Sequence, residues 1–180
     1  LDATNVVRPE ISVITNISLD HVNTLGNSVE QIALEKAGII KDNVPVVVSP
    51  QDPSVLEILT DISVQRNARL IDVVQEKSWK MISSDLKRQI VEIEGLEGKS
   101  VFELPLLGSH QIENTATAIA AVENLPLYYE EGIPEKVVEA GIGSVEWPGR
   151  MYLKSMDERI VVADGAHNPY SISKLVQAIN

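Results

Sequence analysis

The chain has 180 residues, of which 15 are Lys or Arg and 26 are Asp or Glu, and its formal net charge is −11. This acidic balance argues against non-specific binding to nucleic acid, which needs a basic surface, although a few local groups can still hold phosphate. The hydrophobic content of 44% is enough to bury a core, and the absence of cysteine excludes disulfides and thiolate metal sites. Because the sequence shows no signal peptide and no apolar run of membrane-spanning length, we expect a cytoplasmic protein without a membrane partner.

The ends of the sequence indicate a piece of a longer protein. It starts abruptly at Leu1 and stops within a helical pattern at Asn180. This length suits one domain, or one domain and part of another. We expect one domain over residues 1–149, the start of a second over residues 150–180, and a monomeric parent protein.

The first pattern is a strand, a loop and a helix. Residues 12–18 are β-branched and apolar, as in a buried parallel strand, and residues 19–27 form a polar loop. The following helix, expected over residues 28–41, begins with Ser28 and Gln31 spaced as a capping box. In open α/β sheets, ligands bind at the carboxyl ends of the strands, so this loop lies where a site is expected.

A lysine interrupts the apolar stripe of this helix. Lys36 occupies the i+7 position of a stripe formed by Val29, Ile32, Ala33, Ala37 and Ile40. In one interpretation its methylene stem covers apolar surface and its ammonium reaches water. In the other the amine is buried beside His21 and loses its proton, so that it can add carbon dioxide and become an anionic carbamate facing a cation. Lys36 and His21 together favour the second interpretation more strongly than either residue does alone.

The next segments continue a strand–helix alternation. Strands are expected over residues 44–49 and 69–73, with a helix between them that runs to residue 67. Asp52 followed by Pro53 is typical of an N-cap and first helical position. This order predicts right-handed crossovers and a mostly parallel sheet flanked by helices, which is an α/β fold.

The pattern then changes to short extended runs. Residues 79–82, 89–93 and 100–104 are separated by polar or glycine-bearing turns, which predicts an antiparallel extension attached to the parallel sheet. An alanine-rich helix follows, with its packing face over residues 112–122, and Asn114 lies in its first turn. Asparagine there either caps or is solvated, or it contacts an anion at the helix N-terminus.

The last third ends in a polar loop. A helix is expected over residues 134–140 and a rigid turn over residues 147–150. A hairpin of residues 151–155 and 159–163 leads into the loop, and Ser171 is expected to cap a final helix over residues 172–178. The loop holds Asp164, His167 and Asn168 between a strand and a helix, a place where binding and ordinary surface roles are equally expected.

The residues by themselves do not name a substrate. The sequence contains no Walker-type glycine loop, no legible Ser/His/Asp triad and no histidines at the spacing of a zinc site. These observations support an α/β fragment with one metal-capable loop and one polar loop.

Four stretches in order resemble a known family. They are Leu1–Asn5, Asn16–His21 with Leu25-Gly26 and Ile32–Ile39, Gly108–Gln111 with Asn114, and Pro148–Arg150 followed by Asp164–Pro169. Together they resemble the Mur ligase superfamily, and within it the folylpolyglutamate synthase and dihydrofolate synthase branch. The resemblance implies the second half of a central ATPase domain and the start of a Rossmann-like C-terminal domain.

The resemblance implies an ATP-dependent amide ligase. ATP phosphorylates a carboxylate of folate or dihydropteroate, and the amine of L-glutamate displaces the phosphate. By the family pattern His21 binds Mg²⁺, and Lys36 is the lysine that is carbamylated to support a second Mg²⁺. Both are therefore candidate catalytic and metal-binding residues.

The remaining matched positions imply substrate contacts. Asn114, Arg150 and Asp164 correspond to nucleotide-binding positions, and a planar guanidinium such as that of Arg150 suits phosphate. His167 is similar to a residue near the incoming glutamate. The segment Leu1, Asp2 and Ala3 is similar to one that contacts the pterin of dihydropteroate.

Two other functions stay open. One is a peptidoglycan-precursor ligase of the same superfamily, which joins an amino acid to a UDP-muramyl substrate, and the other is a non-catalytic nucleotide-binding or scaffold module. The family's phosphate-binding loop is expected upstream of residue 1, so we expect the 180-residue chain by itself to release no ADP.

Overall fold

The computed structural model describes residues 3–19, 28–95, 98–125, 132–157 and 159–179. The chain divides into two compact units. The first comprises Leu1–Glu76 with Thr117–Gly132, and the second comprises Lys77–Ala116 with Ile133–Asn180. The division falls inside helix α5 (Ser109–Glu123), which contributes residues to both units.

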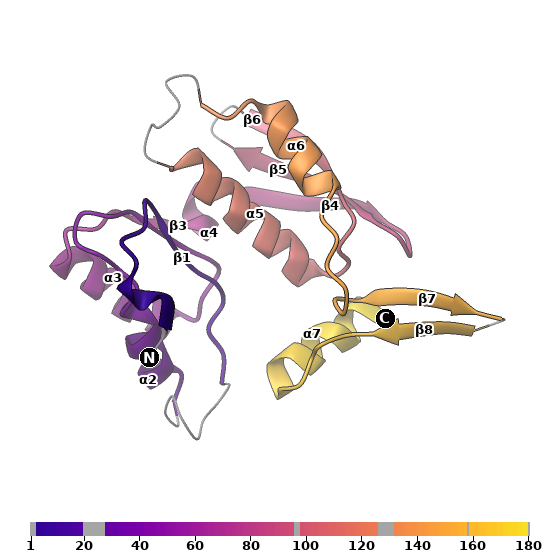
Figure 1. Cartoon of the computed structure of the whole chain (residues 1–180), viewed down its shortest axis with the longest axis horizontal. Coiled ribbons are helices and arrows are strands. Elements are labelled where there is room, and N and C mark those ends of the chain that lie inside the picture. Colours follow the sequence, from indigo (N-terminus) through magenta and orange to yellow (C-terminus); the bar gives the residue numbers. More distant parts are fainter. Residues whose placement is uncertain (1–2, 20–27, 96–97, 126–131, 158, 180) are drawn as a thin grey trace. The chain divides into compact units, whose positions relative to one another are not determined.

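A parallel sheet forms the centre of the first unit. Its strands are β1 (Ser12–Ile14), β2 (Val46–Val48) and β3 (Leu70–Asp72), in the order β1-β2-β3. Both pairs are parallel, with Val47 opposite Val13 and Ile71. Figure 1 labels β1 and β3 of this unit. The predicted parallel sheet is therefore confirmed, and every residue of β2 is buried, as its Val-Val-Val sequence requires.

The strands are shorter than expected. The predicted strand over residues 12–18 ends at Ile14 because side-chain amides replace the ladder beyond it. Asn16 Nδ2 donates to the Pro50 carbonyl at 2.7 Å, and the Ile17 N–H donates to Gln51 Oε1 at 2.9 Å. These bonds keep the chain beside the segment that follows β2 without extending the sheet.

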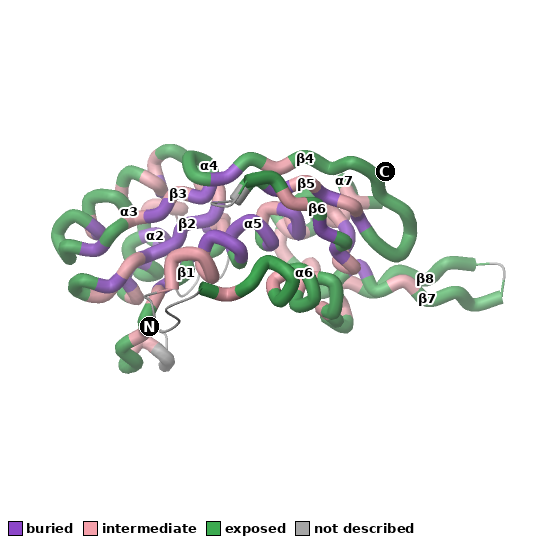
Figure 2. Tube along the Cα trace, turned by 90° about the horizontal axis from the view of Figure 1, so that it is seen from above, coloured by how far each residue is buried: buried purple, intermediate pink, exposed green. Residues whose placement is uncertain are grey.

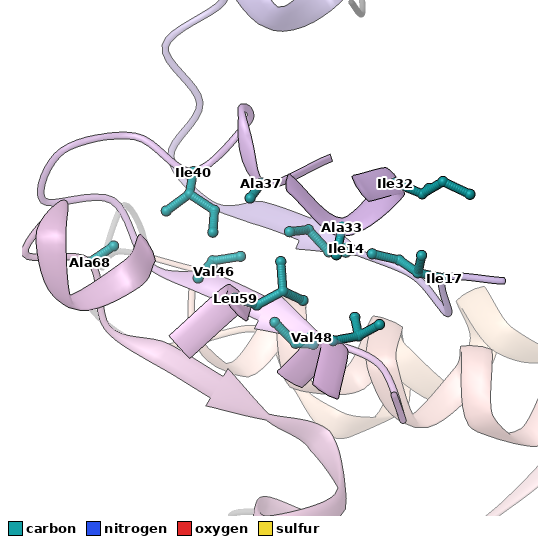
Figure 3. Close-up of a cluster of buried hydrophobic side chains, with 11 residues drawn as sticks. Ile14, Ile17, Ile32, Ala33, Ala37, Ile40, Val46, Val48, Leu59 and Ala68 are labelled. Atoms are coloured by element: carbon teal, nitrogen blue, oxygen red, sulfur yellow. The ribbon is translucent and has the colours of Figure 1, made fainter. Parts of the chain in front are cut away.

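Two helices supply the first core. They are α2 (Val29–Ala37) and α3 (Pro53–Gln65), which pack on each other. Figure 3 shows their apolar side chains gathered with those of β1 and β2. Ile32 and Leu59 are at most 1% exposed, and Val46 is fully buried. This core is the dominant stabilising feature of the unit.

The predicted helix starts are confirmed by their caps. Ser28 Oγ accepts from the Gln31 N–H at 3.3 Å, and Asp52 Oδ1 accepts from the Ser54 N–H at 3.1 Å with Pro53 at the first helical position. The first helix ends at Ala37 instead of residue 41, since Gly38 begins a series of turns. A 3₁₀ turn (η1, Ala3–Val6) and the short helix α4 (Val73–Glu76) were not expected.

The second unit contains an antiparallel sheet. Its strands are β4 (Ser78–Ser84), β5 (Gln89–Gly95) and β6 (Gly98–Leu104), in that order. The predicted antiparallel pairing is confirmed. Its expected attachment to the parallel sheet is wrong: within the described residues β4, β5 and β6 pair only with one another and form a sheet of their own.

The C-terminal part of the second unit is a hairpin and a helix. The expected hairpin is present as β7 (Tyr152–Met156) and β8 (Arg159–Ala163), mostly exposed and green in Figure 2. Helix α6 (Glu135–Gly143) precedes the hairpin and α7 (Pro169–Ile179) follows it. The boundary expected between residues 149 and 150 stays a prediction, as does the Rossmann-like character of the part that follows.

The final helix begins earlier than expected. It starts at Pro169, and Asn168 takes the capping role that was assigned to Ser171. Asn168 Oδ1 accepts from the Ser171 N–H at 2.8 Å, while Ser171 Oγ accepts from the Asn168 N–H at 3.1 Å. The two side chains thus cap each other's backbone, with proline at the first helical position. Throughout the described ranges, no helix is both long and apolar enough to cross a bilayer.

Candidate functional site

Asp164 is fixed by backbone donors at the end of the β7–β8 hairpin. Its Oδ2 accepts from the Met151 N–H at 2.8 Å and its Oδ1 accepts from the Ala166 N–H at 2.7 Å. The Gly165 N–H donates to the Gly149 carbonyl at 2.8 Å, which joins the two chain segments that flank the hairpin. The predicted residues Asp164 and Arg150 therefore lie at the same end of this hairpin.

The turn that presents Arg150 has an unusual backbone. Gly149 has a φ of 81°, and Met151 has a φ of 48°, a value that costs energy for a residue with a side chain. Met151 is buried and its N–H is bonded to Asp164, so packing and a charge-assisted hydrogen bond hold this conformation. Arg150 is exposed between these two residues, and its guanidinium can reach an anion.

His110 lies in the first turn of α5, close to this hairpin end. Burial lowers the pKa of His110; Asp164 opposes this effect, and Lys174 and Arg150 add to it. Its Nδ1 is buried and makes no hydrogen bond with the described residues. His110, Asp164 and Arg150 therefore interact electrostatically within the second unit.

Asn114 shares a helix face with His110. The two residues are four positions apart in α5, so their side chains project on the same side. Asn114 is exposed, and its Nδ2 donates to Gln111 Oε1 at 3.0 Å. Asn114 lies in the second turn of the helix, not in the first as expected, because α5 already begins at Ser109.

His167 occupies the loop between β8 and α7. Its ring is exposed, and its Nδ1 lies 2.8 Å from the Gly165 carbonyl. The His167 N–H donates to Ser171 Oγ at 3.1 Å, so the loop is tied to the first turn of α7. The loop therefore presents an exposed imidazole three residues after Asp164, just before α7 begins.

The expected burial of Lys36 is wrong, because its side chain is exposed. It lies in the last turn of α2, one residue before the helix ends at Ala37, where a long stem leaves the apolar stripe and reaches water. A positive charge is also favourable at a helix C-terminus. His21, Leu1 and Asp2 lie outside the described residues, and of Ala3 only the backbone of η1 is described.

The described residues do not by themselves form a metal site. Across the described ranges, no three His, Asp or Glu side chains come together as metal ligands would. The exposed amine of Lys36 supplies no anion unless it is modified. The expected Mg²⁺ therefore rests on the resemblance and not on this geometry.

Sequence reasoning assigned no role to three polar residues around the start of α5. Gln89, His110 and Gln111 lie there within the second unit, and the side chains of Gln89 and Gln111 are buried. His110 and Gln111 belong to the quoted Gly-Ser-His-Gln stretch, which was a usable signal. Gln89 is a polar residue at the start of an apolar strand, and no motif marks it.

Comparisons with known proteins agree on one family. Residues 2–122 match the family model described as the Mur ligase middle domain. The chain is 33% identical over 180 residues to the dihydrofolate synthase/folylpolyglutamate synthase of Bacillus subtilis (strain 168), covering 99% of this chain and 41% of that protein. It is 36% identical over 189 residues to the protein of the same name from Mycobacterium tuberculosis, with 99% of this chain and 38% of that protein covered.

Solved structures give the same result. A structure described as an FPGS-AMPPCP-folate complex matches with a TM-score of 0.92 and 32% identity, covering 99% of this chain and 43% of that chain. Folylpolyglutamate synthase of Mycobacterium tuberculosis complexed with ADP matches with a TM-score of 0.85 and 34% identity, covering 99% and 40%. The chain thus spans about two fifths of the length of these relatives.

Proposed function

This chain belongs to the Mur ligase family, as a middle-domain member, and from that premise we propose that its parent protein is an ATP-dependent ligase that adds L-glutamate to folate or dihydropteroate. The observation that supports this proposal most directly is that the match runs through nearly the whole chain in relatives named for this activity. The UDP-muramyl alternative and the scaffold alternative are not favoured by these names.

The proposed reaction has two balanced steps. A carboxylate oxygen of the acceptor attacks the γ-phosphorus of ATP, and the bond to the bridging oxygen breaks to release ADP. The glutamate amine then attacks the acyl carbon, an amide bond forms, and phosphate leaves as the amine loses a proton. The phosphoryl step needs positive charge beside the transferred group.

The residues at the hairpin end suit the nucleotide in this reaction. We assign Asn114, Arg150 and Asp164 to ATP binding, since the second unit brings the hairpin residues beside the start of α5. The exposed guanidinium of Arg150 can make paired hydrogen bonds to a phosphate. His167 is assigned to the incoming glutamate, and Leu1, Asp2 and Ala3 to the pterin.

We also propose Mg²⁺ as a cofactor, with His21 and a carbamylated Lys36 as its ligands. When bound, Mg²⁺ would neutralise charge on the phosphates. An exposed lysine at a helix end is accessible to carbon dioxide, and a bound cation would stabilise the resulting anion. We further propose a monomeric parent in the cytoplasm, which size-exclusion chromatography and cell fractionation would test.

Substrate specificity tests the proposed function. Full-length parent protein is incubated with ATP, Mg²⁺ and L-glutamate, with folate, dihydropteroate or a UDP-muramyl acceptor, and ADP release is measured with the ligated product. We expect product only with the two pterin acceptors. Product with the UDP-muramyl acceptor would support the rival ligase, and ATP binding without any product would support the scaffold.

Lys36→Ala tests the carbamate. In the full-length protein we expect this change to reduce turnover by at least about 100-fold, because a metal ligand is lost, and a small carboxylate such as formate to restore part of it. Lys136→Ala, which removes an exposed lysine of α6, is the matched control and should keep normal turnover. Normal turnover in Lys36→Ala would refute the carbamate role and leave the ligase proposal intact.

A further inference from the structure

Gln89 is a buried polar residue where the strand pattern calls for an apolar one. Gln89, Val91 and Ile93 alternate along β5 and so share one face of the sheet. All three are at most 2% exposed. Burying a primary amide is unfavourable unless its donors are bonded, so a glutamine at this position needs a specific partner.

The partner of Gln89 is the loop that leads into α5. Its Nε2 donates to the Leu106 carbonyl at 2.7 Å and to the Gly108 carbonyl at 3.2 Å. The Gly108 carbonyl also accepts from the Gln111 N–H at 3.0 Å. One carbonyl therefore joins the antiparallel sheet to the first turn of the helix.

The backbone of this loop requires glycine at position 108. Gly108 has a φ of +103°, which favours glycine, and a Cβ there would lie 2.7 Å from His110 Cε1 and 3.1 Å from Ala178 Cβ. The buried Gln111 then accepts from Asn114 Nδ2 at 3.0 Å. Two hydrogen bonds therefore link Gly108 to Asn114 by way of Gln111.

We propose that Gln89 is a positioning residue for the nucleotide site: its double hydrogen bond sets the Gly108 turn, and through Gln111 it orients Asn114. This inference rests on the proposed function only in assigning Asn114 to ATP. Gln89 touches neither substrate nor reacting atoms. Its role is to fix the start of α5 relative to the sheet.

Gln89→Met tests this role, because methionine keeps the length and apolar stem and removes the donor. In the full-length protein we expect the dissociation constant for the ATP analogue AMPPCP and the KM for ATP to rise about tenfold, with the KM for glutamate within twofold. Val91→Ala, on the same face of β5, is the control. It removes buried methyl groups and so lowers Tm, but it should leave the dissociation constant for AMPPCP within twofold of the wild-type value.

The outcomes separate this inference from the proposed function. Unchanged AMPPCP binding in Gln89→Met, or an equal loss in Val91→Ala, would overturn the positioning role, as would a wild-type protein that binds no nucleotide. Binding of AMPPCP without ligation of any acceptor would overturn only the function. If Gln89→Met does not fold, hydrogen exchange in the wild-type protein decides: AMPPCP should slow exchange over residues 106–111, and unchanged exchange there would refute the role.

Discussion

At the scale of single residues, His110 is the group whose titration reports on the candidate site. Its imidazole is partly buried and interacts electrostatically with Lys174, Arg150 and Asp164, and burial is the largest cause of its lowered pKa. The unfolded state therefore binds a proton more readily than the folded state as pH falls below the ordinary value of 6.5. It follows that this histidine reduces the free energy of unfolding as pH falls from 6.5 towards its lowered pKa. Above 6.5 it has no such effect.

We expect the His110 ring to titrate below 6.5 and its neighbours to move its pKa in opposite directions. Lys174→Met should raise the pKa by removing a cation, and Asp164→Asn should lower it by removing the carboxylate. Nuclear magnetic resonance of the ring protons, assigned with His110→Gln, measures each pKa. A pKa at or above 6.5 in the unaltered chain would contradict this account of the site.

Lys36 shows where reasoning from residue spacing fails. The spacing assigns this lysine to the stripe of buried residues on α2, but the helix ends one residue later and the side chain is exposed. Periodicity assigns a direction to a side chain and says nothing of how far the helix continues over its core. The apolar spacing therefore does not determine whether the end of a long side chain at a helix terminus is buried or exposed.

At the scale of elements, α3 depends on its N-cap. Asp52 satisfies the Ser54 N–H, and Pro53 needs no donor partner at the first helical position. We expect Asp52→Ala to lower the free energy of unfolding of the chain by about 1 kcal/mol. Asp61→Ala, an exposed change on the same helix, should cost about 0.5 kcal/mol or less. Equal effects in urea denaturation would show that the cap contributes nothing.

The elements differ in how well their sequences define them. The starts of α2 and α3 lie at their expected caps, Ser28 and Asp52, whereas α7 is capped by Asn168 and not by Ser171. The end of β1 also differs from the expectation, because Asn16 and Gln51 make side-chain bonds to the backbone of the facing segment. A cap is set by neighbours in sequence, whereas the end of a strand depends on a segment more than thirty residues away.

At the scale of the whole molecule, the charge of −11 sets how the chain responds to salt. Excess carboxylates repel one another, and added salt screens this repulsion. We expect Tm to rise between about 10 and 150 mM NaCl, which scanning calorimetry measures. We also expect no retention on a heparin column at physiological salt. A Tm that falls with salt, or retention on heparin, would contradict the role assigned to net charge.

Apart from η1 and α4, the sequence by itself determined the order of strands and helices. It also determined the caps of α2 and α3, the hairpin near the C-terminus and the motifs that resemble the Mur ligase family. These features depend on neighbouring residues and on hydrophobic periodicity. Only the tertiary structure decided that the antiparallel strands form a separate sheet, that Lys36 is exposed, and that Gln89 bonds the loop before α5. The reason is physical: each of these outcomes depends on which distant segments pack together and on where their polar groups find partners, and no local pattern encodes that choice.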